Sequence, residues 1–223
     1  MKARQAGFTL VEIAIVLVII GLLLGGILKG QEMITQAKIK NVIADFSGVS
    51  AAYHGYQDRY RAIPGDDPNA AARWAVAPAA TSGNGNGVVA GAYNSANAAD
   101  ESRLWWDHLR RAGFVSGNGT QQPFNALTGQ IGVQTGDGQA AVGPTMLNAA
   151  GGNGFVGLIM CSANLPDKIA IAVDTQMDDG ASNLGTVRAL LQAAPNPAIG
   201  AAQVATAAYA ETSTNIYTLC RSL

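Results

Sequence analysis

The most unusual charged residue in this sequence is Glu12, which interrupts an otherwise uncharged apolar run over residues 8–28. An acid inside a membrane-spanning helix costs a few kcal/mol near the centre of the bilayer, and such residues are functional candidates for that reason. Near the start of a helix, however, a carboxylate also interacts favourably with the helix dipole and with interfacial water. Position alone therefore leaves both a functional and a purely structural role for Glu12 open.

Candidate catalytic side chains are scarce in the rest of the sequence. His54 and His108 lie far apart, and no Ser/His/Asp set, Cys/His pair or metal cluster has the spacing of a catalytic centre. We expect His108 to be a hydrogen-bonded histidine at the surface or edge of the fold. The Gly-x-Gly-x-Gly stretch over residues 83–87 has no strand before it and no helix after it, which argues against a phosphate loop. The sequence therefore predicts no catalytic residue, no cofactor and no enzymatic activity.

Acidic residues come close together in two short stretches. Asp174, Asp178 and Asp179 carry oxygens of the kind that calcium prefers as ligands. Their spacing is not that of an EF-hand loop and no further acid lies nearby in the sequence, so an ordinary Asp-Asp-Gly turn is the preferred interpretation. The same holds for Asp66 and Asp67. The sequence therefore predicts no metal site, and the first three acids are kept as the less favoured calcium candidates.

The elements that must position these residues begin with the apolar run itself. As an α-helix, residues 8–28 would measure about 31 Å, which matches the hydrocarbon core of a bilayer. A secretory signal peptide has a shorter apolar region followed by a small-x-small cleavage site. The residues after this run, 29–32, offer no such site. A membrane anchor is therefore favoured over a cleaved secretory signal.

The sequence GFTLVEIAIVLVIIGLLLGG, residues 7–26, resembles the class III signal of type IV prepilins and of the related pseudopilins of type II secretion. The shared pattern is a short basic leader that ends in glycine, then a phenylalanine, then Thr-Leu-Val-Glu and an apolar run. Gly7 matches the last leader residue, and Glu12 matches the lone acid of the family. Phe8 matches the first mature residue, whose amine is N-methylated in the family.

This resemblance implies a structural subunit of a bacterial surface filament. A prepilin peptidase would remove the leader, residues 1–7, from a single-pass precursor in the inner membrane. The mature chain would then join an extracellular homopolymer through the pilus or type II secretion assembly machinery. Adhesion, motility and DNA uptake are all roles that the family fills.

Two alternatives to a major pilin remain open. A minor pilin or a type II secretion pseudopilin shares Gly7, Phe8 and Glu12, so the N-terminus does not separate them from a major pilin. Some pseudopilins bind calcium with acids of a C-terminal loop, so a calcium site would favour the pseudopilin. A membrane-anchored binding protein that never polymerises is the alternative from another class, and it leaves Gly7 and Glu12 unexplained. The formal net charge of −1 gives no basic surface of the kind that nucleic acid requires, so no nucleic-acid partner is predicted.

Cleavage after Gly7 would give Phe8 a free ammonium, four residues before Glu12 and about 6 Å from it along a helix. A carboxylate and an ammonium attract strongly in a low dielectric, and either one is costly to leave unpaired. Copies staggered by that distance would pair Glu12 of one chain with Phe8 of the next. This pairing would set the axial register of assembly.

The apolar run also contains two small-xxx-small patterns, Gly21 with Gly25 and Gly26 with Gly30. Such spacing places glycines on one helix face and permits another helix to approach closely in lipid. Glycine also weakens a helix relative to alanine. We therefore expect residues 21–30 to pack against neighbouring helices and to be the flexible stretch in a polymer.

Helical periodicity continues beyond the apolar run. Apolar residues recur at steps of one, three or four, and the sequence Ile63-Pro64-Gly65 is a strong helix stop. Residues 8–61 are therefore predicted to form one long helix, with residues 8–28 spanning the membrane. Residues 62–223 are predicted to form a globular head that covers its second half. The apolar positions are Ile39, Val42, Ile43, Phe46, Val49, Tyr53, Tyr56 and Tyr60.

The head is predicted to combine one short helix with several short strands. The segment over residues 100–112 has an acidic start, a basic end and a following glycine, as helices do. Together with the long helix, this predicts an α+β fold with a small antiparallel sheet and large loops, which the resemblance also implies. The strand candidates are residues 129–133, 155–161, 168–174 and 216–220.

The two cysteines of the chain, Cys161 and Cys220, each fall in a strand candidate. If the head is exported, they are expected to form a disulfide, whereas a cytosolic protein would keep two buried thiols. The membrane anchor favours the disulfide. The resemblance supports it, because members of the family often have a disulfide near the C-terminus.

Overall fold

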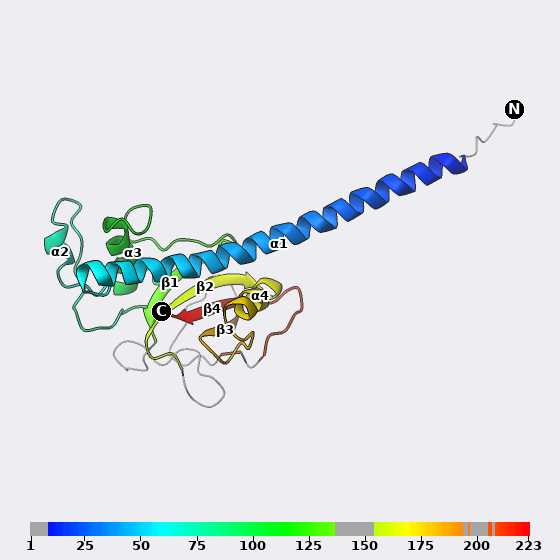
Figure 1. Cartoon of the computed structure of the whole chain (residues 1–223). Helices are drawn as coiled ribbons and strands as arrows, with labels where there is room; N and C mark the ends of the chain where they lie inside the picture. Colours follow the sequence, from blue (N-terminus) through cyan, green and yellow to red (C-terminus); the bar gives the residue numbers. More distant parts are fainter. Residues whose placement is uncertain (1–8, 137–153, 194–195, 197–204, 207) are drawn as a thin grey trace. The chain divides into compact units, whose positions relative to one another are not determined.

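The structure of the protein is a computed structural model that describes residues 9–136, 154–193, 196, 205–206 and 208–223. The chain divides into two compact units, residues 1–38 and residues 39–223. Helix α1, Leu10–Tyr60, contributes to both units (Figure 1). Gly7 and Phe8 lie outside the described residues.

The first unit is the N-terminal part of α1, and its side chains are open to the surroundings. Large apolar residues are exposed throughout it, for example Leu22 at 73% and Leu28 at 67%. Of the described helices, α1 alone is long and apolar enough to cross a membrane, and none of its most apolar stretch is buried. A helix that is apolar on all sides is stable only when lipid or other apolar helices surround it.

In the second unit, residues 39–60 of α1 form one wall of the main core. The predicted stripe is buried: Phe46 and Tyr56 are fully buried, while Ile43 and Tyr60 are partly buried against the same core. Burying a large apolar side chain contributes roughly 1.5–3 kcal/mol, so the stripe fastens this part of the helix to the head. The prediction of a core stripe is confirmed.

Among the described residues, the head contains a four-stranded antiparallel sheet in the order β1-β2-β4-β3. The C-terminal strand therefore lies inside the sheet, where it pairs with strands on both sides. Side chains alternate between the two faces: Met160 and Leu219 point into the main core, whereas Ile159 and Cys220 join a smaller cluster. The predicted α+β fold is confirmed. The strands are β1 (Ile131–Thr135), β2 (Leu158–Pro166), β3 (Val187–Gln192) and β4 (Ile216–Ser222).

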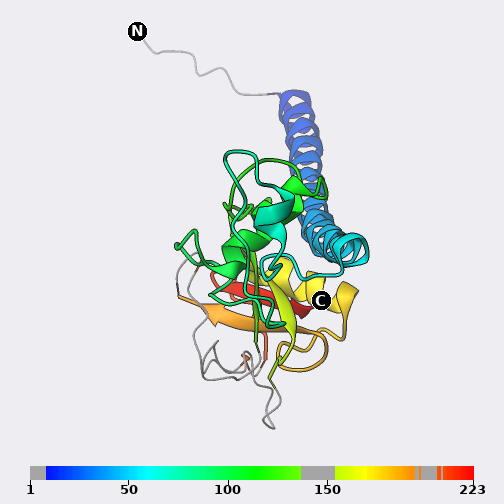
Figure 2. The ribbon, with the colours of Figure 1, turned by 90° about the vertical axis from the view of Figure 1, so that its left-hand side faces the viewer.

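Helix α3, Glu101–Arg111, packs into the same core as the second part of α1 (Figure 2). Trp105 and Trp106 are both fully buried there. Gly113, just beyond its end, has a φ of +81°, the left-handed conformation in which helices commonly stop. This helix was predicted, whereas the short helix α2, Ala70–Arg73, was not.

Residues 168–174 form a helix, so the strand predicted there is wrong. They belong to α4, Asp167–Met177, which directly follows β2. The segment is a short apolar run between two charged residues, which fits a buried strand, but Ile169, Ala170 and Val173 are also spaced to bury one side of a helix, and all three are buried. Asp167 in the first turn is an additional helix signal.

The strand that the sequence analysis missed is β3. Its burial pattern alternates over the first residues, with Val187 and Ala189 fully buried and Arg188 less so. The alternation covers too few residues to indicate a strand by itself. Antiparallel pairing with β4 extends over the whole of β3 and stabilises it. Pairing with a distant segment is not visible in a local pattern.

Candidate functional site

The N-terminal site begins at Thr9, the residue before α1, and includes Glu12 in the first turn. The backbone N–H and the hydroxyl of Thr9 both donate to Oε2 of Glu12, each at 2.8 Å. The backbone N–H of Glu12 donates in return to Oγ1 of Thr9 at 3.3 Å. This reciprocal arrangement is a capping box, which satisfies otherwise free amides at a helix start. It also fixes the position of the carboxylate.

Thr9 is a site residue that the sequence analysis missed. Its signal was present, because Thr-x-x-Glu directly before an apolar run is the sequence form of a capping box. Glu12 is exposed, and Thr9 is the one described residue that hydrogen-bonds its carboxylate. The helix-start role is therefore present in the structure, and the negative charge is not neutralised by any described cation.

The four glycines of the apolar run lie on the exposed part of α1. A Cβ added at Gly21, Gly25, Gly26 or Gly30 would meet no described atom within 4 Å. No described contact within the chain therefore requires glycine at these positions. The open backbone is compatible with the close approach of another helix, and this packing role stays a prediction.

A match to a known family falls on this same segment. Residues 2–28 match the family model of the prokaryotic N-terminal methylation motif, which is the hallmark of type IV pilins and pseudopilins. The N-terminal segment of the chain therefore carries the methylation motif of type IV pilins and pseudopilins. The resemblance found in the sequence is thereby confirmed, and the motif points to a structural protein. No curated protein and no solved structure matches the chain.

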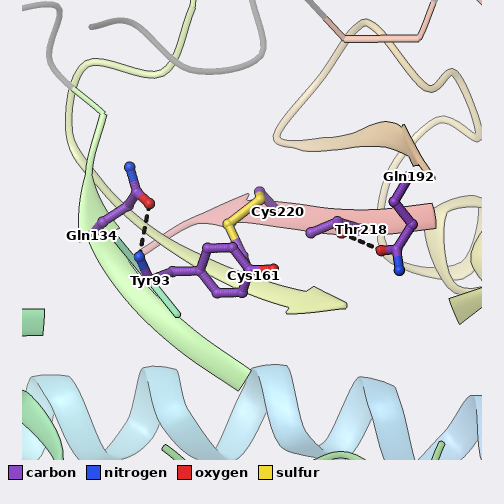
Figure 3. Close-up of a disulfide and its surroundings, with 6 residues drawn as sticks. All are labelled: Tyr93, Gln134, Cys161, Gln192, Thr218 and Cys220. Carbon is purple, nitrogen blue, oxygen red and sulfur yellow. Dashed lines mark hydrogen bonds between the residues drawn. A yellow bond between two sulfur atoms is a disulfide. The ribbon is translucent and has the colours of Figure 1, made fainter. Parts of the chain in front are cut away.

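The predicted disulfide joins Cys161 of β2 to Cys220 of β4, which are register partners in the sheet. Figure 3 shows it on the sheet face away from α1, next to the buried ring of Tyr93. The backbone N–H of Tyr93 donates to the side-chain oxygen of Gln134 at 2.9 Å and so ties this segment to β1. The disulfide closes a loop with a sequence separation of 59 between distant parts of the head.

The three calcium candidates lie together in the folded head. Carboxylate oxygens of Asp174, Asp178 and Asp179 come within 4.8 Å of one another. Asp178 accepts hydrogen bonds from the N–H groups of Thr186 and Val187 at the start of β3. The three acids come together because α4 ends directly before the turn to β3. A strand over residues 168–174, as predicted from the sequence, would not have brought them together in this way.

Asp174 is the buried member of this cluster. Its Oδ2 accepts a hydrogen bond from the Tyr209 hydroxyl at 2.6 Å, while its Oδ1 is buried without a hydrogen-bond partner among the described residues. Burial raises the pKa of Asp174, and the charges of Asp179 and Asp178 raise it further, against the hydrogen bond from Tyr209. An oxygen-rich site with an unsatisfied carboxylate oxygen suits a hard cation such as Ca²⁺.

The glycine-rich stretch over residues 83–87 is held by an acid of the chain itself. The carboxylate of Asp66 accepts hydrogen bonds from the N–H groups of Gly85 at 2.6 Å, Asn86 at 3.1 Å and Gly87 at 2.7 Å. The amides that would cradle a phosphate are thus already occupied. This contact explains the glycines as a structural loop and agrees with the argument against a phosphate site.

Beside that loop lies a buried polar group centred on Asp67. Asp67 accepts hydrogen bonds from the Tyr56 hydroxyl at 2.6 Å and from Arg73 at 2.5 Å. His108 is fully buried, so the expectation of a surface or edge histidine is wrong. Its Nδ1 accepts from the Gly65 N–H at 2.9 Å and its Nε2 lies 2.8 Å from the carbonyl oxygen of Thr81. Burial lowers the pKa of His108, and both ring nitrogens serve to hold the fold.

Proposed function

We propose that this chain is a structural subunit of a type IV pilus-like surface filament. The observation that carries the proposal is the methylation motif at residues 2–28, placed on a helix whose apolar side chains are exposed. An apolar helix of this length has two stable environments, the bilayer and a bundle of similar helices. A pilin occupies the first as a precursor and the second as a filament subunit.

In this proposal a prepilin peptidase cuts between Gly7 and Phe8, and the new amine of Phe8 is methylated. The Phe8 ammonium of one copy then pairs with Glu12 of the next. Thr9 contributes by holding the Glu12 carboxylate at the helix start before a partner arrives. A positioned carboxylate loses less freedom when the ion pair forms.

The glycines Gly21, Gly25, Gly26 and Gly30 are proposed to permit close packing between neighbouring helices. The head, residues 62–223, is carried outside the membrane on this bundle. Its disulfide suits an oxidising compartment. Adhesion, motility or DNA uptake would then depend on what the exposed head contacts, and the inner-membrane assembly machinery would supply the subunits.

A type II secretion pseudopilin is the second candidate, and one observation favours it. The cluster of Asp174, Asp178 and Asp179 has a buried, unsatisfied carboxylate oxygen. We propose that these three residues hold a calcium ion, which would neutralise their mutual repulsion. The ion would thereby stabilise the turn between α4 and β3.

The test is to isolate sheared surface material from native cells, image it by electron microscopy and determine the N-terminus of the protein by mass spectrometry. We expect filaments that contain this chain, with a mature N-terminus at methylated Phe8. A chain that keeps residues 1–7 and stays as a single membrane-bound species would exclude the filament subunit. A methylated chain confined to short periplasmic assemblies would favour the pseudopilin.

A further inference from the structure

Asp45 of α1 lies beside an open groove on the head. The groove has a volume of about 320 Å³ and is lined by Ala44 and Gly48 of α1 and by Phe114 and Phe124 beyond α3. The two phenylalanines are 37% and 59% exposed. A Cβ added at Gly48 would meet no described atom within 4 Å. The groove is thus accessible, combines aromatic side chains with polar atoms, and contains one acid, Asp45.

No described residue of the chain compensates the charge of Asp45. It is partly buried, and burial raises its pKa. None of the described hydrogen bonds or ion pairs involves its carboxylate. A partly buried carboxylate without a partner destabilises a folded domain. Within the described head, Asp45 therefore has a cost and no evident structural benefit.

We infer that this groove receives Lys40 from a second copy of the chain, with the lysine ammonium on the Asp45 carboxylate. Lys40 is exposed and forms no ion pair with a described residue. Its apolar four-carbon stem and charged tip match a groove with aromatic side chains and a single acid. The inference rests on the proposed polymer, because the polymer supplies the second copy.

The two arginines at the C-terminal end of α1 already have contacts within the chain. Arg59 lies over the ring of Tyr60, with 5.3 Å between its guanidinium carbon and the ring centroid. Arg61, just after the helix, lies 3.5 Å from Asp58. Of the lysines and arginines described over residues 39–61, Lys40 is the one without an ion pair or a ring contact, so its ammonium is available for a neighbour.

Helix geometry explains why the pair forms between copies and not within one. Lys40 and Asp45 are five residues apart, which is about 7.5 Å along the axis and about 140° around it. Side chains on one helix meet at spacings of three or four residues. Lys40 and Asp45 therefore lie on nearly opposite faces of the helix. In a row of parallel copies, each copy can then contact one neighbour through Lys40 and the next neighbour through Asp45. Such a head-to-tail contact repeats without closing, as a filament requires.

The two proposed ion pairs need axial shifts of similar size. The pairing of Phe8 with Glu12 needs a shift of four residues, about 6 Å, and that of Lys40 with Asp45 needs five, about 7.5 Å. The difference of about 1.5 Å lies within the reach of a flexible lysine side chain.

The test uses the full chain in cells that make filaments. Lys40→Cys and Asp45→Cys are introduced together, sheared filaments are oxidised, and the products are separated under non-reducing conditions. We expect a ladder of covalent multimers. The two new cysteines cannot join within one helix, because their Cα atoms lie too far apart for a disulfide. The matched control combines Asp45→Cys with Lys168→Cys, an exposed lysine on α4, and gives no ladder.

Charge reversal gives a second, independent readout. Asp45→Lys and Lys40→Asp should each lower the yield of sheared filaments by at least about tenfold, because they place like charges together, and the double reversal should restore it. Lys40 is exposed, so Lys40→Asp tests the contact even if Asp45→Lys unfolds the head. Normal filaments in both single variants, without a cysteine ladder, would overturn the contact and leave the polymer standing. A wild-type chain that forms no filaments would overturn both proposals before any variant is made.

Discussion

Helix α1 carries apolar side chains on all sides in its first part and as a stripe in its second part, but only the second part has a partner in the described chain. Every side chain over residues 10–29 is exposed, whereas Phe46 and Tyr56 are 0% exposed. Both stretches are helical, so helix formation does not account for the difference. The second part is covered by the head of the same chain. The first part has to be covered by lipid or by other copies.

The acids of the two regions differ in the same way. Asp67 in the head accepts hydrogen bonds from Tyr56, Arg73 and the N–H of Asn69. Glu12 accepts hydrogen bonds from Thr9 and meets no described cation. The head is thus largely complete in itself, while the N-terminal segment is built for an external partner. Mutations should separate accordingly into assembly defects and stability defects.

The largest expected effect is on assembly. Glu12→Val should reduce surface filaments by at least about tenfold, because the Phe8 ammonium of a neighbour would be left unpaired in a low dielectric. Membrane insertion should be unchanged, since a more apolar segment inserts at least as well. Filament yield is measured by shearing and electron microscopy, and insertion by membrane fractionation.

Glu32→Gln is the matched control for this variant. Glu32 is also an acid on α1, but it is exposed and already paired with Lys29 at 2.7 Å. An exposed pair of this kind contributes little, so filaments should form normally. Equal filament yields from Glu12→Val and the wild type would show that the acid of the N-terminal part of α1 is not needed for assembly, and so would contradict the contrast between that part and the head.

The second prediction concerns the stability of the head alone. Replacing Cys161 and Cys220 together by serine should lower the free energy of unfolding of the head by about 4 kcal/mol, because an unfolded chain with that loop open has more freedom. Chemical denaturation followed by tyrosine and tryptophan fluorescence measures the change. Membrane insertion of residues 8–28 should be unaffected. A loss below about 1 kcal/mol would mean that the disulfide adds little to the packed sheet.

The sequence was sufficient for features that depend on local pattern. The length and apolarity of the N-terminal run, the core stripe from Ile39 to Tyr60, and the short helix before Gly113 all follow from helical periodicity and stop signals. The family motif was also recognisable from the sequence, because Gly7, Phe8 and Glu12 lie within one short stretch.

The sequence was insufficient where the structure depends on distant contacts. The segment after Pro166 fits either a strand or a helix by its pattern, and packing of Val173 in the main core accompanies the helix. The grouping of Asp174 with Asp178 and Asp179 depends on that helix, and burial of His108 depends on loops far away in the sequence. Local propensity does not carry such information.

The third prediction tests the buried network of the head. Burial opposes the ionisation of Asp67, but hydrogen bonds from Tyr56 and Arg73 outweigh it and hold the pKa of Asp67 below its ordinary 3.8. Asp67→Asn should therefore cost about 2–3 kcal/mol of stability at neutral pH. The contribution of an acid with a lowered pKa is present above pH 3.8 and is lost as the pH falls through the folded value. The difference between wild type and variant should narrow below about pH 4, as measured by denaturation at several pH values.

The smallest expected effect is that of calcium on the head. At neutral pH, millimolar Ca²⁺ should raise the Tm by a few degrees, which corresponds to about 1–2 kcal/mol for a site filled well above its Kd. Mg²⁺ should do less, because it demands a stricter octahedral geometry. Asp179→Asn should remove the effect, and Asp58→Asn, which changes an exposed acid on α1, should leave it unchanged.

The pH dependence of this calcium effect separates specific binding from general screening. Burial raises the pKa of Asp174, so the folded head disfavours its ionised form, and stability without calcium should increase as the pH falls through that raised pKa. Protonation also removes a ligand, so the calcium shift should disappear over the same range. Calcium and a chelator giving the same Tm at pH 7 would show that the cluster is an ordinary turn. The cluster of Asp174, Asp178 and Asp179 would then be stable without an external ion, which would sharpen its contrast with Glu12.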